Sequence, residues 1–290
     1  MIRVAILTPD PTEGDNASLW PKVLARLQSA LDIAGIEAVP TPWTEHVDGG
    51  DGLRHFDRVL PLLAWGYHFQ HARWLRACET WARDGIAISN SANVLAWNSD
   101  KRYLSALAAR GVEIPPTIFT DDLSQALVDR VLADTGAGEL IVKPAVSGGA
   151  WKTQRLRRGD LVGAARGTPM LVQPYLPTIE TEGETSLLFF GGRFSHAVNK
   201  RPVAGEFRIQ EEFGGLYSPV PSPPAGAVAL AEQVLAAVDE PLLYARIDMV
   251  PDADGRWLLM EAELIEPDFY LNVDPAQGAG FARALRDMAP

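Results

Sequence analysis

Two β-type segments near the end of the chain, YARIDMV and RWLLMEAELIEP, constrain the fold most, because the turn PDADG between them predicts an antiparallel pair. Glu261 and Glu263 are two residues apart and therefore leave the same face of their strand. Asp248, on the first segment, is flanked by the apolar Ile247 and Met249. Carboxylates gathered in a mostly apolar sheet need cations in order to stay ionised. Oxygen ligands of this kind suit Mg²⁺ that is completed by water and nucleotide phosphates, so the segment predicts a magnesium site.

A sheet with one face in solvent is the alternative interpretation, since alternating acidic residues are ordinary on such a face. For an isolated pair of glutamates it would be the better interpretation. Arg246 precedes Asp248 by two residues, and a lysine-containing loop lies in the middle of the chain. Together, this arginine and this loop favour the interpretation as a magnesium site.

This loop follows a β-branched run in LIVKPAVSGGA, which places Lys143 at the end of a predicted strand. The small residues Ser147–Ala150 would let backbone N–H groups approach phosphate oxygens, while the lysine supplies a positive charge. A Gly-Gly hairpin turn has the same pattern, so the loop alone is ambiguous. The sequence has no GxxxxGK[ST] motif, and TPDPTEGDN after the first predicted strand does not match GxGxxG. P-loop and Rossmann dinucleotide sites are therefore disfavoured.

Composition sets broader limits. With 47% hydrophobic and 22% charged residues, the chain has the composition of a folded, soluble globular protein. A net charge of −11 would repel a phosphate backbone, so we expect no nucleic-acid partner. There is no apolar run of membrane-spanning length and the chain starts with a strand-like segment, so we expect no membrane association and a cytoplasmic location. The single cysteine, Cys78, lies on an apolar helical face and is expected to be a buried thiol.

The order of patterns predicts a chain of α/β and α+β character in three parts: 1–97 (an open parallel α/β layer), 98–177 and 178–290. The expected strands are Arg3–Leu7, Ile36–Pro40, Val59–Leu63, Ile86–Ser89, Thr117–Thr120, Leu140–Lys143, Thr153–Leu156, Met170–Gln173, Thr185–Phe190, Phe194–Asn199, Arg208–Glu211, Tyr244–Val250 and Trp257–Leu264. The expected helices are one starting at Pro21, Phe69–Arg83, KRYLSALAARG, Leu123–Leu132, Leu161–Ala165, Gly226–Val238 and Gln277–Met288.

Seven motifs then occur in a recognisable order: SDKRYL, IVKP, SGGA, LVQPYLP, GETSLLFFGGRFSHAVNKRP, ARIDMV and MEAELIEP. The order resembles the ATP-grasp superfamily, specifically the glutathione synthetase-like ligases, and the last block looks like the branch with the cycloserine-forming ligase. The resemblance runs from about Trp97 to Leu271. It implies two α+β subdomains that clasp ATP, preceded by a pre-ATP-grasp α/β domain.

For the nucleotide, the resemblance implies that Lys101 and Lys143 contact phosphates, with Lys143 also near the adenine. The other implied nucleotide-binding residues are Ser147, Gly148 and Gly149 in a loop that closes over the phosphates, and Gln173, Tyr175 and Leu176 around the adenine. Either Glu180 or Glu184 would meet the ribose, and the sequence does not decide between them. By default Lys101 would be a surface lysine, and only the order of the motifs argues otherwise.

For the metal and the chemistry, the resemblance implies that Asp248, Glu261 and Glu263 bind Mg²⁺, with Mn²⁺ as an alternative ion. Arg246 would hold the transferring phosphoryl group or the substrate carboxylate, and Lys200 would lie near the phosphates. Many relatives have Asn at the position of Glu263, which leaves the number of ligands and of metal ions open.

Two further segments have open roles. His196 is expected to be a hydrogen-bonded strand histidine and not a catalytic base. The segment with Trp65, Tyr67 and His68, and the segment Thr8–Asp10, are equally well interpreted as substrate contacts or as core and loop residues.

The implied activity is ATP-dependent, ADP-producing carboxylate–amine ligation through an acyl phosphate. Its small amino-acid-like substrate could react with a second molecule or close a ring intramolecularly, as in cycloserine formation. The loop around Gly148 is expected to order over ATP and exclude water. A non-catalytic ATP-binding regulatory protein and a metal-dependent hydrolase are the alternatives. The relatives also lead us to expect a homodimer.

Overall fold

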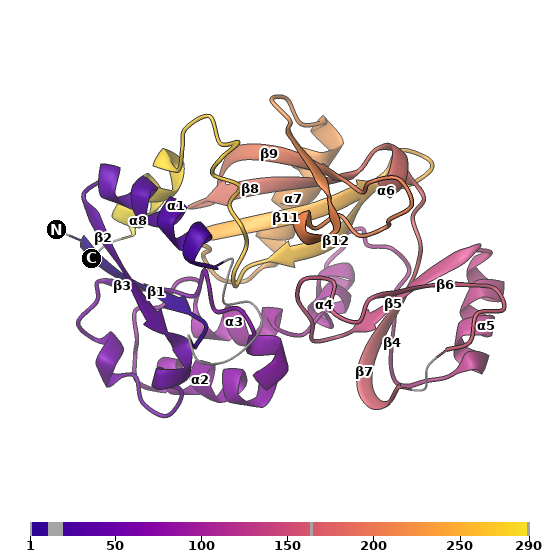
Figure 1. Ribbon diagram of the computed structural model, residues 1–290, viewed down its shortest axis with the longest axis horizontal. Coiled ribbons are helices and arrows are strands. Elements are labelled where there is room, and N and C mark those ends of the chain that lie inside the picture. Colours follow the sequence, from indigo (N-terminus) through magenta and orange to yellow (C-terminus); the bar gives the residue numbers. More distant parts are fainter. Residues whose placement is uncertain (1, 11–19, 163–164, 289–290) are drawn as a thin grey trace.

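An open parallel sheet forms the N-terminal layer of the computed structural model, which describes residues 2–10, 20–162 and 165–288 (Figure 1). The apolar strand β1 (Ile2–Thr8) lies between β2 (Ile36–Pro42) and β3 (Arg58–Leu60), and both pairings are parallel, which confirms the predicted layer. Its helices are α1 (Trp20–Ile33), α2 (His71–Arg83), which buries Cys78 as expected, and α3 (Ala92–Asn98). Short 3₁₀ turns occur at Trp43–His46, Asp51–Leu53 and Tyr67–Gln70.

The second sheet is antiparallel, in the order β4-β7-β5-β6. Its strands are β4 (Ile118–Leu123), β5 (Glu139–Pro144), β6 (Gln154–Arg157) and β7 (Ala165–Pro174). Helix α5 (Gln125–Thr135) begins after Ser124, whose hydroxyl caps it, and packs Leu127 and Val131 against Leu140 and Val142 of β5. This small layer carries Lys143 and the loop after it.

The third sheet, in the order β10-β9-β8-β11-β12, is also antiparallel. Its strands are β8 (Glu184–Phe190), β9 (Arg193–Arg201), β10 (Leu216–Pro219), β11 (Tyr244–Pro251) and β12 (Trp257–Glu263). Helix α7 (Ala225–Ala237) and helix α4 (Tyr103–Ala109) contribute buried residues to the core of this sheet. The short helix α6 (Thr178–Thr181) connects β7 to β8.

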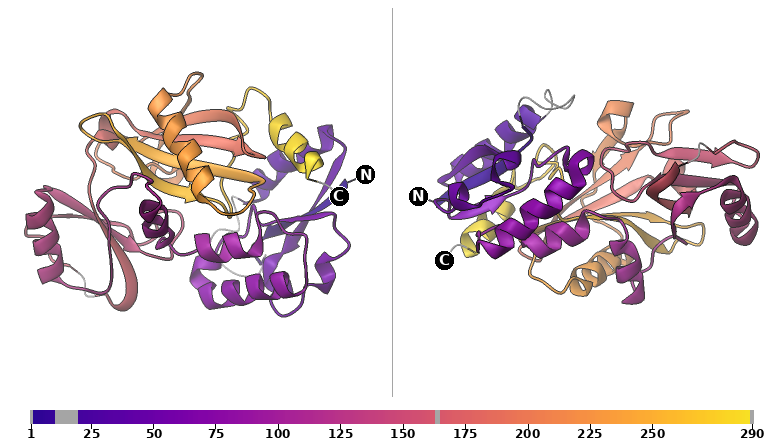
Figure 2. Two further views of the ribbon diagram at one scale, coloured as in Figure 1. Left: turned by 180° about the vertical axis from the view of Figure 1, so that it is seen from behind. Right: turned by 90° about the horizontal axis from the view of Figure 1, so that it is seen from below.

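The C-terminal helix α8 (Ala279–Asp287) returns to the N-terminal layer and packs against α1, so the two described ends of the chain lie close together (Figures 1 and 2). Phe281 and Leu285 share a core cluster with Val4 and Ile6 of β1. The division of the chain at residues 97 and 177 stays a prediction. The sheets fall within it, although α4 packs against the sheet of the C-terminal third.

Three expected elements are wrong. Ile86–Ser89 makes only one bridge, Val59↔Ile88, because the neighbouring strand β3 is only three residues long. Arg208–Glu211 forms no strand, because β10 already occupies the edge of β9. In the expected helix Leu161–Ala165, the first two residues are not helical, residues 163 and 164 lie outside the described residues, and Ala165 begins β7. Within the described ranges, no helix is both long and apolar enough to cross a membrane.

Candidate functional site

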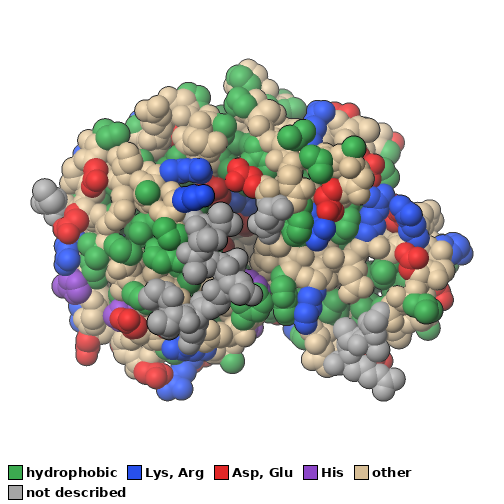
Figure 3. Space-filling model, viewed as in Figure 1, with side chains coloured by type: hydrophobic (Ala, Val, Ile, Leu, Met, Phe, Trp, Pro, Cys, Tyr) green, Lys and Arg blue, Asp and Glu red, His purple; other side chains and the backbone are tan. Residues whose placement is uncertain are grey.

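A cavity of about 1040 Å³ lies where the three sheets meet, and Figure 3 shows a hollow near the centre of one face with charged side chains at its edge. Residues from all three layers line this cavity. The predicted site residues among them are Lys101, Lys143, Ser147, Gly148, Gly149, Gln173, Tyr175, Leu176, Glu184, Lys200, Arg246, Asp248, Glu261 and Glu263. Glu180 is the one predicted site residue that does not line it.

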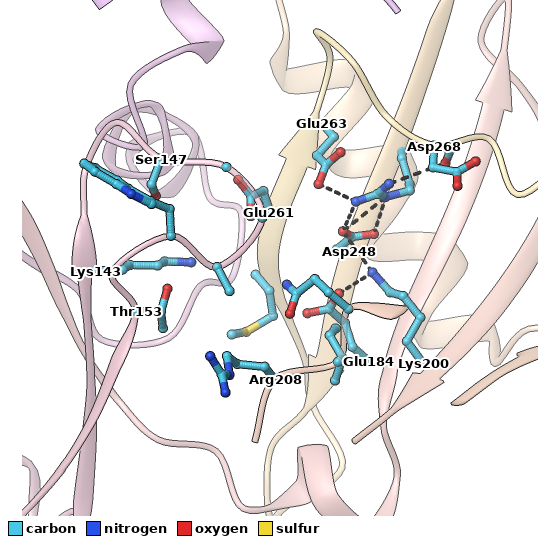
Figure 4. A pocket seen from close by; sticks show the side chains of 18 of the residues that line it. Lys143, Ser147, Thr153, Glu184, Lys200, Arg208, Asp248, Glu261, Glu263 and Asp268 are labelled. Atoms are coloured by element: carbon cyan, nitrogen blue, oxygen red, sulfur yellow. Dashed lines mark hydrogen bonds and ion pairs between the residues drawn. The ribbon is translucent and has the colours of Figure 1, made fainter. Parts of the chain in front are cut away.

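Strands β11 and β12 place four charged side chains on one face (Figure 4). Their register sets Arg246 opposite Glu263 and Asp248 opposite Glu261, with a β-bulge just beyond Asp248. The Arg246 guanidinium donates from Nη2 to Asp248 Oδ2 at 3.0 Å and also to Glu263. Burial by itself would raise the pKa of Asp248, but Arg246 and Lys200 outweigh it and lower the pKa to about 2.

Lys200 extends this network from β9 towards β8. Its ammonium lies 3.2 Å from Asp248 Oδ2 and 2.6 Å from Glu184 Oε1, and Ser186 donates a hydrogen bond of 2.5 Å to Asp248 Oδ1. Burial alone would lower the pKa of Lys200, but Asp248 and Glu184 raise it well above its usual value. The pKa of Glu184 is also raised, chiefly by burial. A charged lysine is therefore fixed at the base of the cavity.

Lys101 is buried and not on the surface, because its ammonium has two partners in the cavity wall. It donates to the backbone oxygen of Ser147 at 2.8 Å and pairs with Glu261 Oε1 at 2.8 Å. Lys143 differs, because within the described chain its ammonium makes no hydrogen bond or ion pair. Burial and then the nearby charge of Lys101 lower the pKa of Lys143. An unpaired, half-buried cation in the cavity wall is suited to an anionic ligand.

The segment predicted to hold adenine is ordered by its own contacts. Gln173 donates to Thr117 Oγ1 at 2.7 Å, and the backbone N–H of Tyr175 donates to Glu139 O at 2.9 Å. Glu180 accepts hydrogen bonds from the Tyr175 hydroxyl (2.7 Å) and from Arg155 (2.9 Å), outside the cavity. Glu184 lies inside the cavity. Which of the two meets the ribose stays a prediction.

The glycine-containing loop makes an aromatic contact with the N-terminal layer. The Trp151 ring centroid lies 5.3 Å from that of Phe69, in a T-shaped arrangement, and 5.8 Å from that of His68. Gly149 has φ +56°, a value that favours glycine. Burial and the charge of Lys101 lower the pKa of His68 to about 4, so this imidazole is neutral at pH 7. Phe69 and Trp151 hold the loop across the cavity.

Comparison with known proteins decides the family. No protein-family model matches the chain. The sequence is 30% identical to the cycloserine biosynthesis protein DcsG of Streptomyces lavendulae over 283 residues, which cover 90% of this chain and 92% of that protein. The chain belongs to the ATP-grasp ligases. A glutathione synthetase of Prochlorococcus marinus (strain MIT 9313) is 29% identical over 290 residues, covering 92% of this ligase and 86% of that protein.

Solved structures agree with this result. The crystal structure of D-cycloserine synthetase DcsG aligns with this ATP-grasp ligase with a TM-score of 0.82 and 28% identity, covering 99% of this chain and 100% of the other. A D-alanine–D-alanine ligase from Bacillus anthracis in complex with ATP aligns with a TM-score of 0.70, over 100% of this chain and 96% of that one. At 19% identity, the second likeness shows the fold alone. The fold predicted from the motif order is confirmed.

The acidic residues of this ligase are paired with basic ones. Among the residues that the structure describes, no three His, Cys, Asp or Glu side chains form a group that could hold a metal ion. Burial nevertheless raises the pKa of Glu263 to about 8; Arg246 opposes this effect, and Asp248 and Glu261 add to it. A carboxyl group whose ionisation is opposed by burial and by neighbouring carboxylates fits a divalent cation, and the donors are the hard oxygens that Mg²⁺ prefers. The assignment of Asp248, Glu261 and Glu263 to the metal stays a proposal.

The sequence patterns indicated no role for some of the residues that line the cavity of the ligase. Phe69, Trp151, Arg208, Glu266 and Tyr270 line the cavity without having been singled out. Trp151 directly follows the small-residue loop, and Glu266 ends the second acidic segment. These positions beside predicted site segments are the signals in the sequence that could have marked Trp151 and Glu266 as site residues.

Of the two segments whose roles the sequence left open, only one lines the cavity of the ligase. Trp65, Tyr67 and His68 line the cavity, whereas Thr8–Asp10 does not. His196 is a buried strand histidine that hydrogen-bonds the backbone oxygen of Phe269 at 2.8 Å, as expected.

Proposed function

We propose that this ligase joins a nitrogen nucleophile to the carboxylate of a small amino-acid-like substrate, using ATP and Mg²⁺. One observation supports this most: the cations Lys101, Lys143, Lys200 and Arg246 line a single cavity together with the acids of β11 and β12. Lys101, Lys200 and Arg246 are paired with acids, whereas Lys143 has no partner among the described residues. A triphosphate supplies an anion for Lys143 and attracts the paired cations, which leaves the acids to a divalent cation. ATP is therefore the proposed nucleotide.

In the first step, a substrate carboxylate oxygen attacks the γ-phosphorus of ATP. The bond to the β,γ-bridging oxygen breaks, and ADP leaves. Lys143 and Arg246 are placed to stabilise the charge on the transferring phosphoryl group, because both line the cavity and carry positive charge. The product is an acyl phosphate.

In the second step, the nitrogen attacks the acyl carbon. The carbon–oxygen bond to the phosphoryl group breaks, inorganic phosphate leaves and the nitrogen loses a proton. Water would hydrolyse the acyl phosphate, so the cavity must exclude it. The loop carrying Trp151, packed against Phe69 and His68, supports this role, and we propose that it opens for ATP.

Magnesium would supply positive charge next to the phosphate oxygens. Asp248, Glu261 and Glu263 would hold it. Their present partners Lys101 and Arg246 are cations that phosphate oxygens can equally attract. When a nucleotide binds, its phosphates would attract Lys101 and Arg246, and the carboxylates would then bind the metal in place of these cations.

The identity of the nucleophile separates two versions of the reaction. Similarity to DcsG favours a nitrogen in the same molecule, which closes a ring, whereas similarity to glutathione synthetase favours a second molecule. We propose the intramolecular version, because the DcsG likeness is the higher in sequence identity. A single substrate should then suffice for ADP release. Homodimer formation and a cytoplasmic location stay predictions, and light scattering tests the first.

ADP release, measured with panels of amino acids and of ureido and hydroxamate analogues, tests the proposal. We expect release only with ATP, Mg²⁺ and a carboxylate together, and its loss on adding EDTA. Glu261→Ala should reduce the rate at least 100-fold, while Glu79→Gln on the exposed face of α2 should not change it. A wild-type rate for Glu261→Ala would overturn the metal assignment.

The two alternative functions predict different results in the same assay. ATP binding without any stimulated release would indicate a regulatory protein. Turnover without ATP would indicate a hydrolase, and a thermal shift with Mg·ATP that is absent with magnesium alone argues against one.

A further inference from the structure

Most buried charged groups of the cavity are paired, but Lys143 and Glu266 are not. Lys101 pairs with Glu261, and Lys200 pairs with Glu184 and Asp248. Arg246 pairs with Asp248 and Glu263. In the described part of the chain, Lys143 has no partner, and the carboxylate of Glu266 makes no ion pair and no hydrogen bond to another residue.

The remaining charged groups of the lining do not change this result. One carboxylate oxygen of Asp268 accepts the backbone N–H of Tyr270 at 2.8 Å. Lys22, Arg26, Lys152 and Glu211 are exposed, and Arg208 pairs with Glu206. Among the half-buried or buried acids of the lining, Glu266 is therefore the one whose carboxylate has neither an ion pair nor a hydrogen bond to another described residue.

Glu266 and Lys143 reach the cavity from different sheets: Lys143 lies on β5 of the second sheet, and Glu266 follows β12 of the third. The charges acting most on Lys143 are Glu261, Lys101, Glu184 and Asp248, and Figure 4 shows this lysine on the β5 side. Those acting most on Glu266 are Glu261, Arg246 and Lys101. Glu261 and Lys101 are thus the charges that act on both unpaired groups.

The charge of Glu266 acts on a side chain of the N-terminal layer. Its charge contributes to the raised pKa of Tyr67, whose side chain is buried beside Trp65 and His68 in the cavity wall. Burial and then the charge of Glu261 raise the pKa of Glu266 to about 7. A carboxylate in such a setting costs free energy unless a cation or N–H donor reaches it.

We propose that Glu266 binds the ammonium group of an amino-acid-like substrate, whose reacting carboxylate lies towards Arg246 and Lys143. This inference rests on the proposed ligase function. It gives the substrate an orientation, with the amine at the N-terminal layer and the carboxylate at the phosphates. A fourth metal ligand is the other use for an acid without a partner, but the three carboxylates proposed for the metal lie on β11 and β12, and Glu266 lies beyond the end of β12.

Matched acids that differ only in the amine test the proposal: D-alanine with D-lactate, L-alanine with L-lactate, and glutamate with 2-hydroxyglutarate. Binding is measured by thermal shift with Mg²⁺ and a non-hydrolysable ATP analogue, and turnover by phosphate release. The wild type should bind at least one amino acid about 10- to 100-fold more tightly than its hydroxy partner, the range expected for a charged hydrogen bond. Glu266→Gln should lose this preference while keeping its shift with the nucleotide. Glu266→Asp should retain part of it, and Glu79→Gln all of it.

Each outcome either supports or overturns the proposed role of Glu266. Equal binding of amino and hydroxy acids by the wild type, or no shift with any amino acid, overturns the proposal without reference to a variant. A preference that survives in Glu266→Gln overturns it too. A preference that is lost in the variant, without phosphate release from any acid, supports Glu266 as the ammonium site and removes the ligase proposal. Phosphate release that is equal with amino acids and with hydroxy acids supports the ligase proposal and overturns the role of Glu266.

Discussion

Lys101 and Glu261 form an ion pair of 2.8 Å that joins the turn between α3 and α4 to the acidic strand β12, with the lysine buried and the glutamate half-buried. The same ammonium donates to the backbone oxygen of Ser147, so one lysine links the carboxylate proposed for the metal to the loop proposed for the phosphates.

Removing this charge should affect both groups. We expect Lys101→Met to lower the rate of ADP release about 100-fold or more, because Glu261 loses its counter-charge and the loop loses an anchor. Arg102→Met, at the exposed neighbouring position, is the control and should stay near the wild-type rate. Urea unfolding shows whether the variants are folded. A Lys101→Met enzyme of normal activity would contradict the arrangement.

ATP affinity should depend on pH through Lys143. A lysine attracts phosphate only while it is protonated, so affinity falls as pH rises through its pKa. Burial and Lys101 lower this pKa, and the fall should therefore begin at a lower pH than for an exposed lysine. Arginine keeps its charge throughout this range, so Lys143→Arg should flatten the profile. Titration calorimetry with Mg·ATP between about pH 7 and 10 measures it, and identical profiles would refute the role of Lys143.

The aromatic contact across the cavity should control the escape of the acyl phosphate to water. In Trp151→Ala we expect more phosphate released per molecule of ligated product and a weaker apparent affinity for ATP. Phe69 is 58% exposed and touches Trp151, so Phe69→Ala should have the same effect with little loss of stability. In a double-mutant cycle on kcat/KM for ATP, the two residues should couple by about two- to tenfold. Independent effects would show that the contact does not hold the loop.

Asn98 should matter for stability. Its side-chain amide donates to Ala262 O at 2.8 Å and accepts from Leu264 N at 3.0 Å, which fixes α3 to the end of β12. Asn98→Ala leaves two buried backbone groups without partners, and we expect a loss of about 2–4 kcal/mol in the free energy of unfolding. Asn93→Ala, at an exposed position of the same helix, should change it by less than about 0.5 kcal/mol. Urea denaturation compares the two.

The sequence by itself determined the strand and helix patterns and the sidedness of β12. The two-residue period of a strand puts Glu261 and Glu263 on one face whatever the rest of the chain does. The turn PDADG likewise indicated that Asp248 would lie on the adjacent strand. These are local properties, set by residues within about a dozen positions of one another.

Tertiary structure decided which groups meet. Trp151 packs on Phe69, which is far away in sequence, and no pattern in either segment indicates the other. Glu180 and Glu184 have equally acidic surroundings in the sequence, yet only the turn of the chain at α6 puts one inside the cavity and leaves the other with Arg155. Glu266 shows its lack of a partner only when every neighbouring cation has been located. Electrostatic and packing energies depend on distances through space, and the order of residues along a chain does not contain those distances until it has folded.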